Sequence, residues 1–198
     1  KYHLWSLSGS AERSNNTHDQ HLTLQPWTGD DISSSNDAEQ YGRLQFQSNN
    51  TTVSTDYFPI YNGEFWNVFM GTTGISASAD TLEFGAYQSN YLKNTSFYRS
   101  SFSYPNQTHR GIQWGDHNQG ISIPKTVYLG GQGNNPAAFY GLVNNLRYSG
   151  SMQELRFYFG ELLSHETLVK QALEPFMYAG NTISSSLENV VLRLPLGS

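Results

Sequence analysis

The chain has 198 residues, of which 14% are aromatic and 14% are charged, and its formal net charge is −5. This length suits one large domain with a sizeable core. The acidic balance argues against nucleic-acid binding, because that binding depends on Lys and Arg that neutralise phosphates. Cysteine is absent, which excludes disulfides and thiolate metal sites. No apolar run reaches the roughly 18 residues that predict insertion into a membrane.

In the first half of the chain, strands are predicted to begin at Leu22 and to occupy residues 41–47, 65–70 and 81–87, and apolar residues alternate with polar ones along 41–47 and 81–87. This period of two is typical of a sheet with one buried face. The segment 65–70 is apolar on both faces, as expected of a central strand. Polar connections are predicted at residues 28–40 and 49–57.

Strands are also predicted in the second half of the chain, at residues 93–103, 126–130, 154–159 and 190–196. In the third of these, Leu155 and Phe157 alternate with Glu154 and Arg156. That pattern predicts one face in the core and one face in solvent. A long polar insertion separates the first two strands.

One helix is predicted at residues 164–174. Ser164 is a good N-cap, and Leu163 and Leu168 stand where a hydrophobic staple would form. Pro175 prevents the helix from continuing. Because almost every other segment favours strands, this lone helix is a signature of the topology.

Many short strands with turn signals between them predict an all-β fold, an antiparallel jelly-roll β-sandwich. No linker or internal repeat divides the chain, so residues 1–198 are interpreted as one domain. The start, KYHLWSLSGS, lacks the basic and apolar blocks of a signal peptide. We therefore expect a segment of a longer polypeptide.

Several segments resemble the concanavalin A-like lectin/glucanase superfamily in its laminin G-like branch: YNGEFWNVFMGT with DTLEFGAY, TVYLGGQGN, and GSMQELRFYFGELLSHETLVKQAL. The resemblance spans residues 22–196. The phrases PIYNGEFW, SGSMQELRFY and LRLPLGS are also similar to large structural proteins of viruses and phages that carry such domains. This similarity implies a jelly-roll sandwich on a virion surface or in an extracellular protein.

Four aromatic residues in or near predicted loops are candidates for contacts with a glycan or a partner: Trp27, Tyr91, Tyr104 and Trp114. Aromatic faces stack on the apolar faces of sugar rings, while Asn, Asp and Gln suit the sugar hydroxyls. The alternative is that these side chains serve a protein interface.

Calcium is the metal that the resemblance implies, and the candidate ligands are Asp30, Asp31 and Asp116, together with Asp37. The simpler interpretation is that these residues form turns and caps in solvated loops. A zinc or copper site at His18 and His21 lacks a third partner, so both are interpreted as surface histidines of a loop. No other cofactor is expected.

Hydrolases of the superfamily use paired carboxylates that alternate along one strand, and no predicted strand carries such a pair. Glu83 and Glu154 are single acids on separate strands, and Glu154 is interpreted as a structural residue. Glycosylation of sequons such as Asn94-Thr95-Ser96 is less favoured than chance occurrence, because large secreted domains usually carry disulfides.

The sequence therefore favours a non-enzymatic interaction domain of a virion or extracellular structural protein. Its partners would be glycans or neighbouring protein subunits, in an assembly that could be homo-oligomeric. The alternative is a carbohydrate-binding lectin, with or without calcium, and a glycoside hydrolase is the least favoured of the three.

Overall fold

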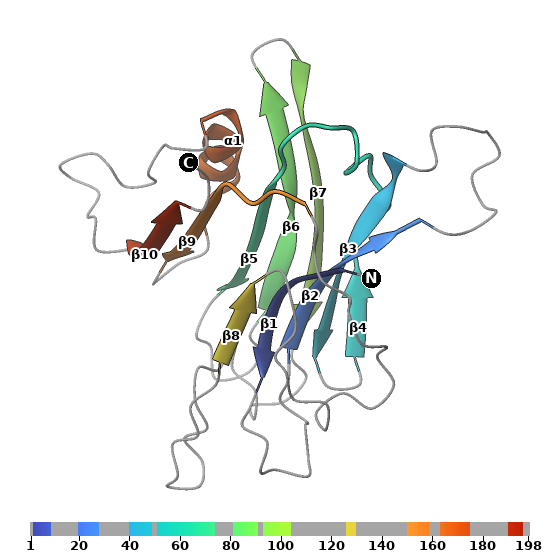
Figure 1. The fold of residues 1–198 in the computed structure, drawn as a ribbon, viewed down its shortest axis with the longest axis vertical. Coiled ribbons are helices and arrows are strands. Elements are labelled where there is room, and N and C mark those ends of the chain that lie inside the picture. Colours follow the sequence, from blue (N-terminus) through green and yellow to red (C-terminus); the bar gives the residue numbers. More distant parts are fainter. Residues whose placement is uncertain are drawn as a thin grey trace, which may run out of the picture.

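The computed structural model describes residues 2–8, 20–27, 40–48, 51–73, 81–90, 93–103, 126–129, 150–158, 163–174 and 190–195. These residues form antiparallel sheets and one short helix (Figure 1). The all-β prediction is confirmed at that level.

The largest sheet contains five strands in the order β4 (Thr51–Ser54), β3 (Gly42–Ser48), β2 (Gln20–Pro26), β1 (Tyr2–Ser8) and β8 (Thr126–Leu129). A second sheet has the order β5 (Asn67–Thr73), β6 (Thr81–Asn90) and β7 (Lys93–Ser103). A separate pair is formed by β9 (Glu154–Tyr158) and β10 (Val190–Pro195). Every one of these pairings is antiparallel.

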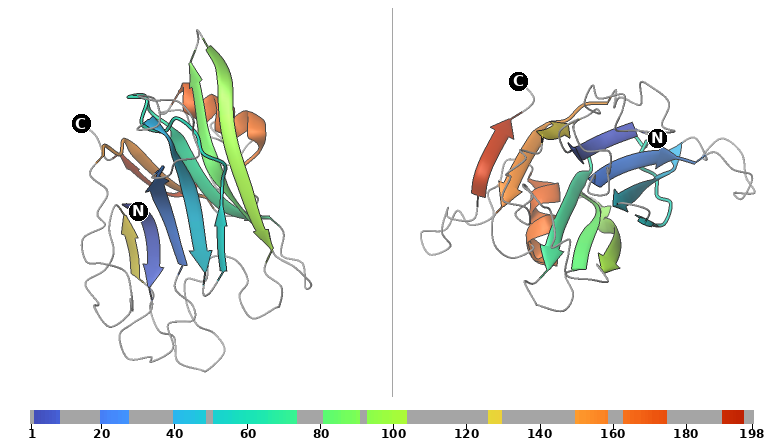
Figure 2. Two further views of the ribbon diagram at one scale, coloured as in Figure 1. Left: turned by 90° about the vertical axis from the view of Figure 1, so that its right-hand side faces the viewer. Right: turned by 90° about the horizontal axis from the view of Figure 1, so that it is seen from below.

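The first two sheets face each other across a shared core (Figure 2). The buried side chains of this core are Leu22, Leu24, Leu44 and Phe46 from the first sheet and Leu82, Phe84 and Ala86 from the second. Phe58 is fully buried between them and packs against Trp66 and Tyr98, at ring-centroid distances of 5.0 and 4.7 Å. Trp66 is thus partly buried and packs against this core.

The helix α1 (His165–Leu173) covers the opposite face of the second sheet (Figures 1 and 2). The Ser164 hydroxyl accepts a hydrogen bond from the backbone N–H of Thr167 at 3.2 Å, which confirms the predicted cap. Leu168 is buried in a cluster with Phe69 and Tyr87, and Leu163 packs against this cluster. Burying a side chain such as Leu168 contributes about 1.5–3 kcal/mol.

Three strands differ from their predictions. β1 was not predicted, and β4 lies within the segment predicted to be a polar connection. β4 forms because Val53 pairs with Phe46 of β3, and threonine suits an extended backbone. β5 lies at an edge of the described three-stranded sheet and not at its centre. It is apolar on both faces because Val68 and Met70 contact the shared core while Phe69 contacts the cluster under α1.

Gly85 of β6 gives a test of this packing. A Cβ atom added there would lie 2.8 Å from Cε1 of Phe69 and would also collide with the carbonyl oxygen of Tyr98. We expect Gly85→Ala to lower the free energy of unfolding by about 1–3 kcal/mol in urea titrations, since overpacking forces the backbone to shift. Ser101→Ala, at an exposed position of β7, should change it by less than about 0.5 kcal/mol. Equal stability of Gly85→Ala and the parent chain would contradict the described packing.

Candidate functional site

The face of β5, β6 and β7 that points away from the shared core is called the outer face here. The strand register brings Tyr87 opposite Phe97, Gly85 opposite Arg99, and Glu83 opposite Ser101 on β6 and β7. Side chains two residues apart share one side of a strand, so these pairs form a ladder on the outer face. α1 covers the part of this face around Tyr87.

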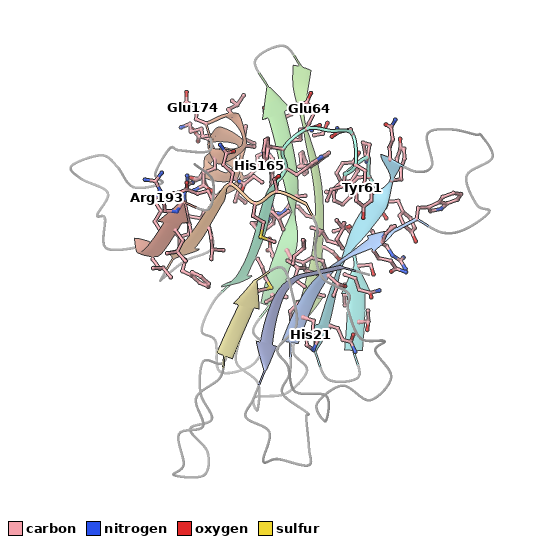
Figure 3. The ribbon with its side chains drawn as sticks, viewed as in Figure 1. His21, Tyr61, Glu64, His165, Glu174 and Arg193 are labelled. Atoms are coloured by element: carbon pink, nitrogen blue, oxygen red, sulfur yellow. The ribbon has the colours of Figure 1, made fainter. Side chains whose placement is uncertain are left out.

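Tyr87 anchors the outer face to the helix. Its side chain is fully buried, and its hydroxyl lies 2.9 Å from Nδ1 of His165, the first residue of α1. His165 itself is exposed and lies at the end of α1 that adjoins the sheet (Figure 3). Burial raises the pKa of the Tyr87 phenol, an effect that Arg99 opposes and Glu83 reinforces. The hydroxyl therefore stays protonated at neutral pH.

Phe97 of β7 lies beside Tyr87 on the outer face, and its side chain is 50% exposed. Its ring is nearly parallel to that of Tyr87, with centroids 5.6 Å apart and an interplanar angle of 17°. The ring of His165 meets it edge-on at 4.9 Å. Two neighbouring rings thus fix an aromatic side chain whose remaining surface faces solvent.

Polar groups flank the exposed ring along the strands. The Arg99 guanidinium is bonded to the Glu83 carboxylate and lies 5.4 Å from the ring centroid of Phe69. On the other side of Phe97 along the strands, the hydroxyls of Ser89 and Thr95 are hydrogen-bonded to each other at 2.8 Å. A fixed aromatic ring with hydrogen-bonding groups on both sides can contact an apolar surface and polar groups of one ligand together.

The first sheet has a different, polar face. The Thr23 hydroxyl donates to the Gln45 carbonyl at 3.2 Å, and the Gln45 amide donates to the Ser54 hydroxyl at 3.2 Å. Arg43 donates to the side-chain oxygen of Gln25 at 3.2 Å. Thr23 and Gln45 are buried, so this network connects strands and is little available to a ligand. The five strands of the sheet contain no Asp or Glu.

Glu154 lies in an ion cluster that joins β9 to β10. It accepts hydrogen bonds from Arg156, at 3.3 Å, and from Arg193, which Figure 3 labels on β10. The side chains of Glu154 and Arg156 are only 8% exposed, so the prediction that they face solvent is wrong. The hydrogen bond from Arg193 lowers the pKa of Glu154; burial opposes this, and the charges of both arginines assist it.

The candidates from the sequence are mostly outside the described residues: Tyr91, Tyr104, Trp114, Asp30, Asp31, Asp37, Asp116 and His18. Trp27 is described and lies directly after β2, half-buried, with its backbone N–H bonded to the Tyr41 carbonyl at 3.0 Å. His21 is 5% exposed within β2, so its interpretation as a surface loop histidine is wrong. Thr23, two residues further along β2, is also 5% exposed, so the face of β2 opposite Leu22 and Leu24 is shielded from solvent as well.

Among the residues described, no three His, Asp or Glu side chains gather in a group suited to a metal ion. Across the same ranges, no helix has the length and apolarity needed to cross a membrane.

Phe97 was not among the binding residues predicted from the sequence. A signal was nevertheless present, because adjacent aromatic residues on a strand point to opposite faces. Phe97 and Tyr98 are such a pair, and Tyr98 packs against the shared core. Phe97 must then lie on the outer face.

The lowered pKa of Glu154 predicts a dependence of stability on pH. A carboxyl whose pKa is lower in the folded chain stabilises the fold above its unfolded pKa, about 4.3, and loses that contribution as the pH falls through the folded value. We expect Glu154→Gln to lower the free energy of unfolding at pH 7 by about 1–3 kcal/mol. The difference in free energy of unfolding between Glu154→Gln and the parent chain should become smaller below about pH 4 in urea titrations at acid pH. Glu64→Gln, at an exposed turn position, is the control, and a deficit of Glu154→Gln that does not change with pH would contradict the ion cluster.

Comparisons with protein-family models, with curated proteins and with solved structures found no match for this chain. The likeness to the concanavalin A-like superfamily accordingly rests on the sequence motifs.

Proposed function

We propose that this chain is a non-enzymatic binding domain, and that it serves in a virion or extracellular structural protein. It contacts glycans or neighbouring protein subunits. The observation that carries the proposal is the exposed ring of Phe97, which Tyr87 and His165 hold on a sheet that is buried on its other side. Exposed aromatic residues on a rigid support are typical anchors of binding surfaces.

The fold proposed is the jelly-roll sandwich of the concanavalin A-like superfamily. Two antiparallel sheets with a common core support it, as does the helix that follows β9. In this scheme residues 1–198 form one domain. Trp27 and the three aromatic residues predicted from the sequence, Tyr91, Tyr104 and Trp114, are further candidates for contacts, and Asp30, Asp31 and Asp116 are candidates for calcium.

Catalysis has less support than binding. The carboxylates of Glu83 and Glu154 are both bonded to arginine side chains. Glycoside hydrolysis needs one carboxyl group to act as an acid and a second to act as a nucleophile or base across the same bond. A carboxylate engaged by arginine is poorly suited to donating a proton. A glycoside hydrolase is therefore the least favoured function.

A lectin is the second candidate, because Phe97 with its polar neighbours suits a sugar ring. The two candidates differ in what occupies the surface. A lectin needs a glycan alone, whereas a structural domain also contacts other subunits, including copies of itself.

The proposal predicts saturable binding without turnover. The chain should bind at least one member of a glycan array, with or without calcium, or should self-associate in sedimentation experiments. Oligosaccharides should be recovered intact after incubation with it. A strictly monomeric chain that binds no glycan at millimolar concentration would contradict the proposal, as would hydrolysis of any oligosaccharide.

A further inference from the structure

We infer that the outer face binds a neutral oligosaccharide laid along β6 and β7, an inference that rests on the proposed binding function. The binding strip consists of Phe97, Arg99, Ser101, the hydroxyl pair of Ser89 and Thr95, and His165 of α1. These residues come from three elements and lie on one surface through the register of β6 with β7 and the bond between Tyr87 and His165.

The strip has one aromatic ring at its centre. Phe97 can stack on the apolar C–H face of a pyranose ring, since half of its surface is open. Its neighbours Tyr87 and His165 already restrict its motion in the free chain. Less conformational entropy is then lost when a ligand binds.

Hydrogen-bonding groups extend from the ring in both directions. Thr95 to Ser101 covers about 20 Å, because a strand rises about 3.3 Å per residue. This length accommodates more than one sugar ring. Nδ1 of His165 is hydrogen-bonded to the Tyr87 hydroxyl. The other ring nitrogen, Nε2, is therefore the one that can bond to a sugar hydroxyl.

The charge of the strip favours a neutral ligand. Arg99 forms an ion pair with Glu83, and on α1 Lys170 forms an ion pair with Glu166 at 2.6 Å, so the charges within each pair cancel. The chain as a whole carries a net charge of −5, which disfavours acidic sugars. Arg99 can still donate to a hydroxyl, because its guanidinium has five N–H donors.

The same strip fits a protein partner less well. The centre of a protein interface is a cluster of apolar and aromatic side chains from which water is excluded. Here a single exposed aromatic ring lies among serine, threonine, arginine and histidine side chains. That composition suits the alternating apolar faces and hydroxyls of a saccharide.

Calorimetric titration of the full chain tests the inference with a panel of neutral oligosaccharides built from glucose, mannose, galactose or xylose. Sialylated and sulfated oligosaccharides form the second panel. We expect binding to at least one neutral compound, and Phe97→Ala should weaken it by about tenfold or more. Phe97→Leu retains apolar bulk for folding but lacks the ring, and should weaken it similarly. Leu192→Ala, at an exposed apolar position of β10, is the matched control and should bind as the parent does.

The other outcomes overturn the inference in distinguishable ways. Neutral-sugar binding that survives both Phe97 substitutions would place the glycan elsewhere on the chain. Binding confined to the acidic panel would contradict the charge argument. Self-association without any glycan binding would overturn the inference while leaving the proposed binding function in place.

Discussion

Strand β6 is packed on both of its faces, and most of the described structure depends on that constraint. Leu82, Phe84 and Ala86 contact the first sheet, while Tyr87 contacts α1 from the other side. A one-residue slip of β6 would exchange these two sets of side chains, so its register is strongly specified. The hydrogen-bonded partner strands β5 and β7 are held in register with it.

The candidate binding surface follows from the same constraint. Because β6 fixes Tyr87, the neighbouring strand must present Phe97 beside it, and α1 brings His165 to the same place. The polar groups along the strip belong to exposed or half-buried positions of the same strands. Rigid strands hold such groups more accurately than loops do, which favours a surface that recognises a shaped ligand.

Local signals in the sequence were sufficient for the helix and for most strands. The cap at Ser164 depends on residues within one turn, and period-two alternation located β6. Contacts between distant residues were not predictable in this way. Glu154 accepts a hydrogen bond from Arg193, which lies 39 residues further along the chain. The exposure of Phe97 depends on its pairing with Tyr87, which only the register of β6 and β7 reveals.

Hydroxyl-radical footprinting with mass spectrometry tests this arrangement most directly, because it compares two adjacent aromatic rings. Tyr87 is fully buried and Phe97 is half exposed, although their rings are stacked. The account predicts rapid oxidation of Phe97 in the folded chain and protection of Tyr87 until the chain unfolds. Equal protection of both rings, or oxidation of Tyr87 before Phe97, would contradict it.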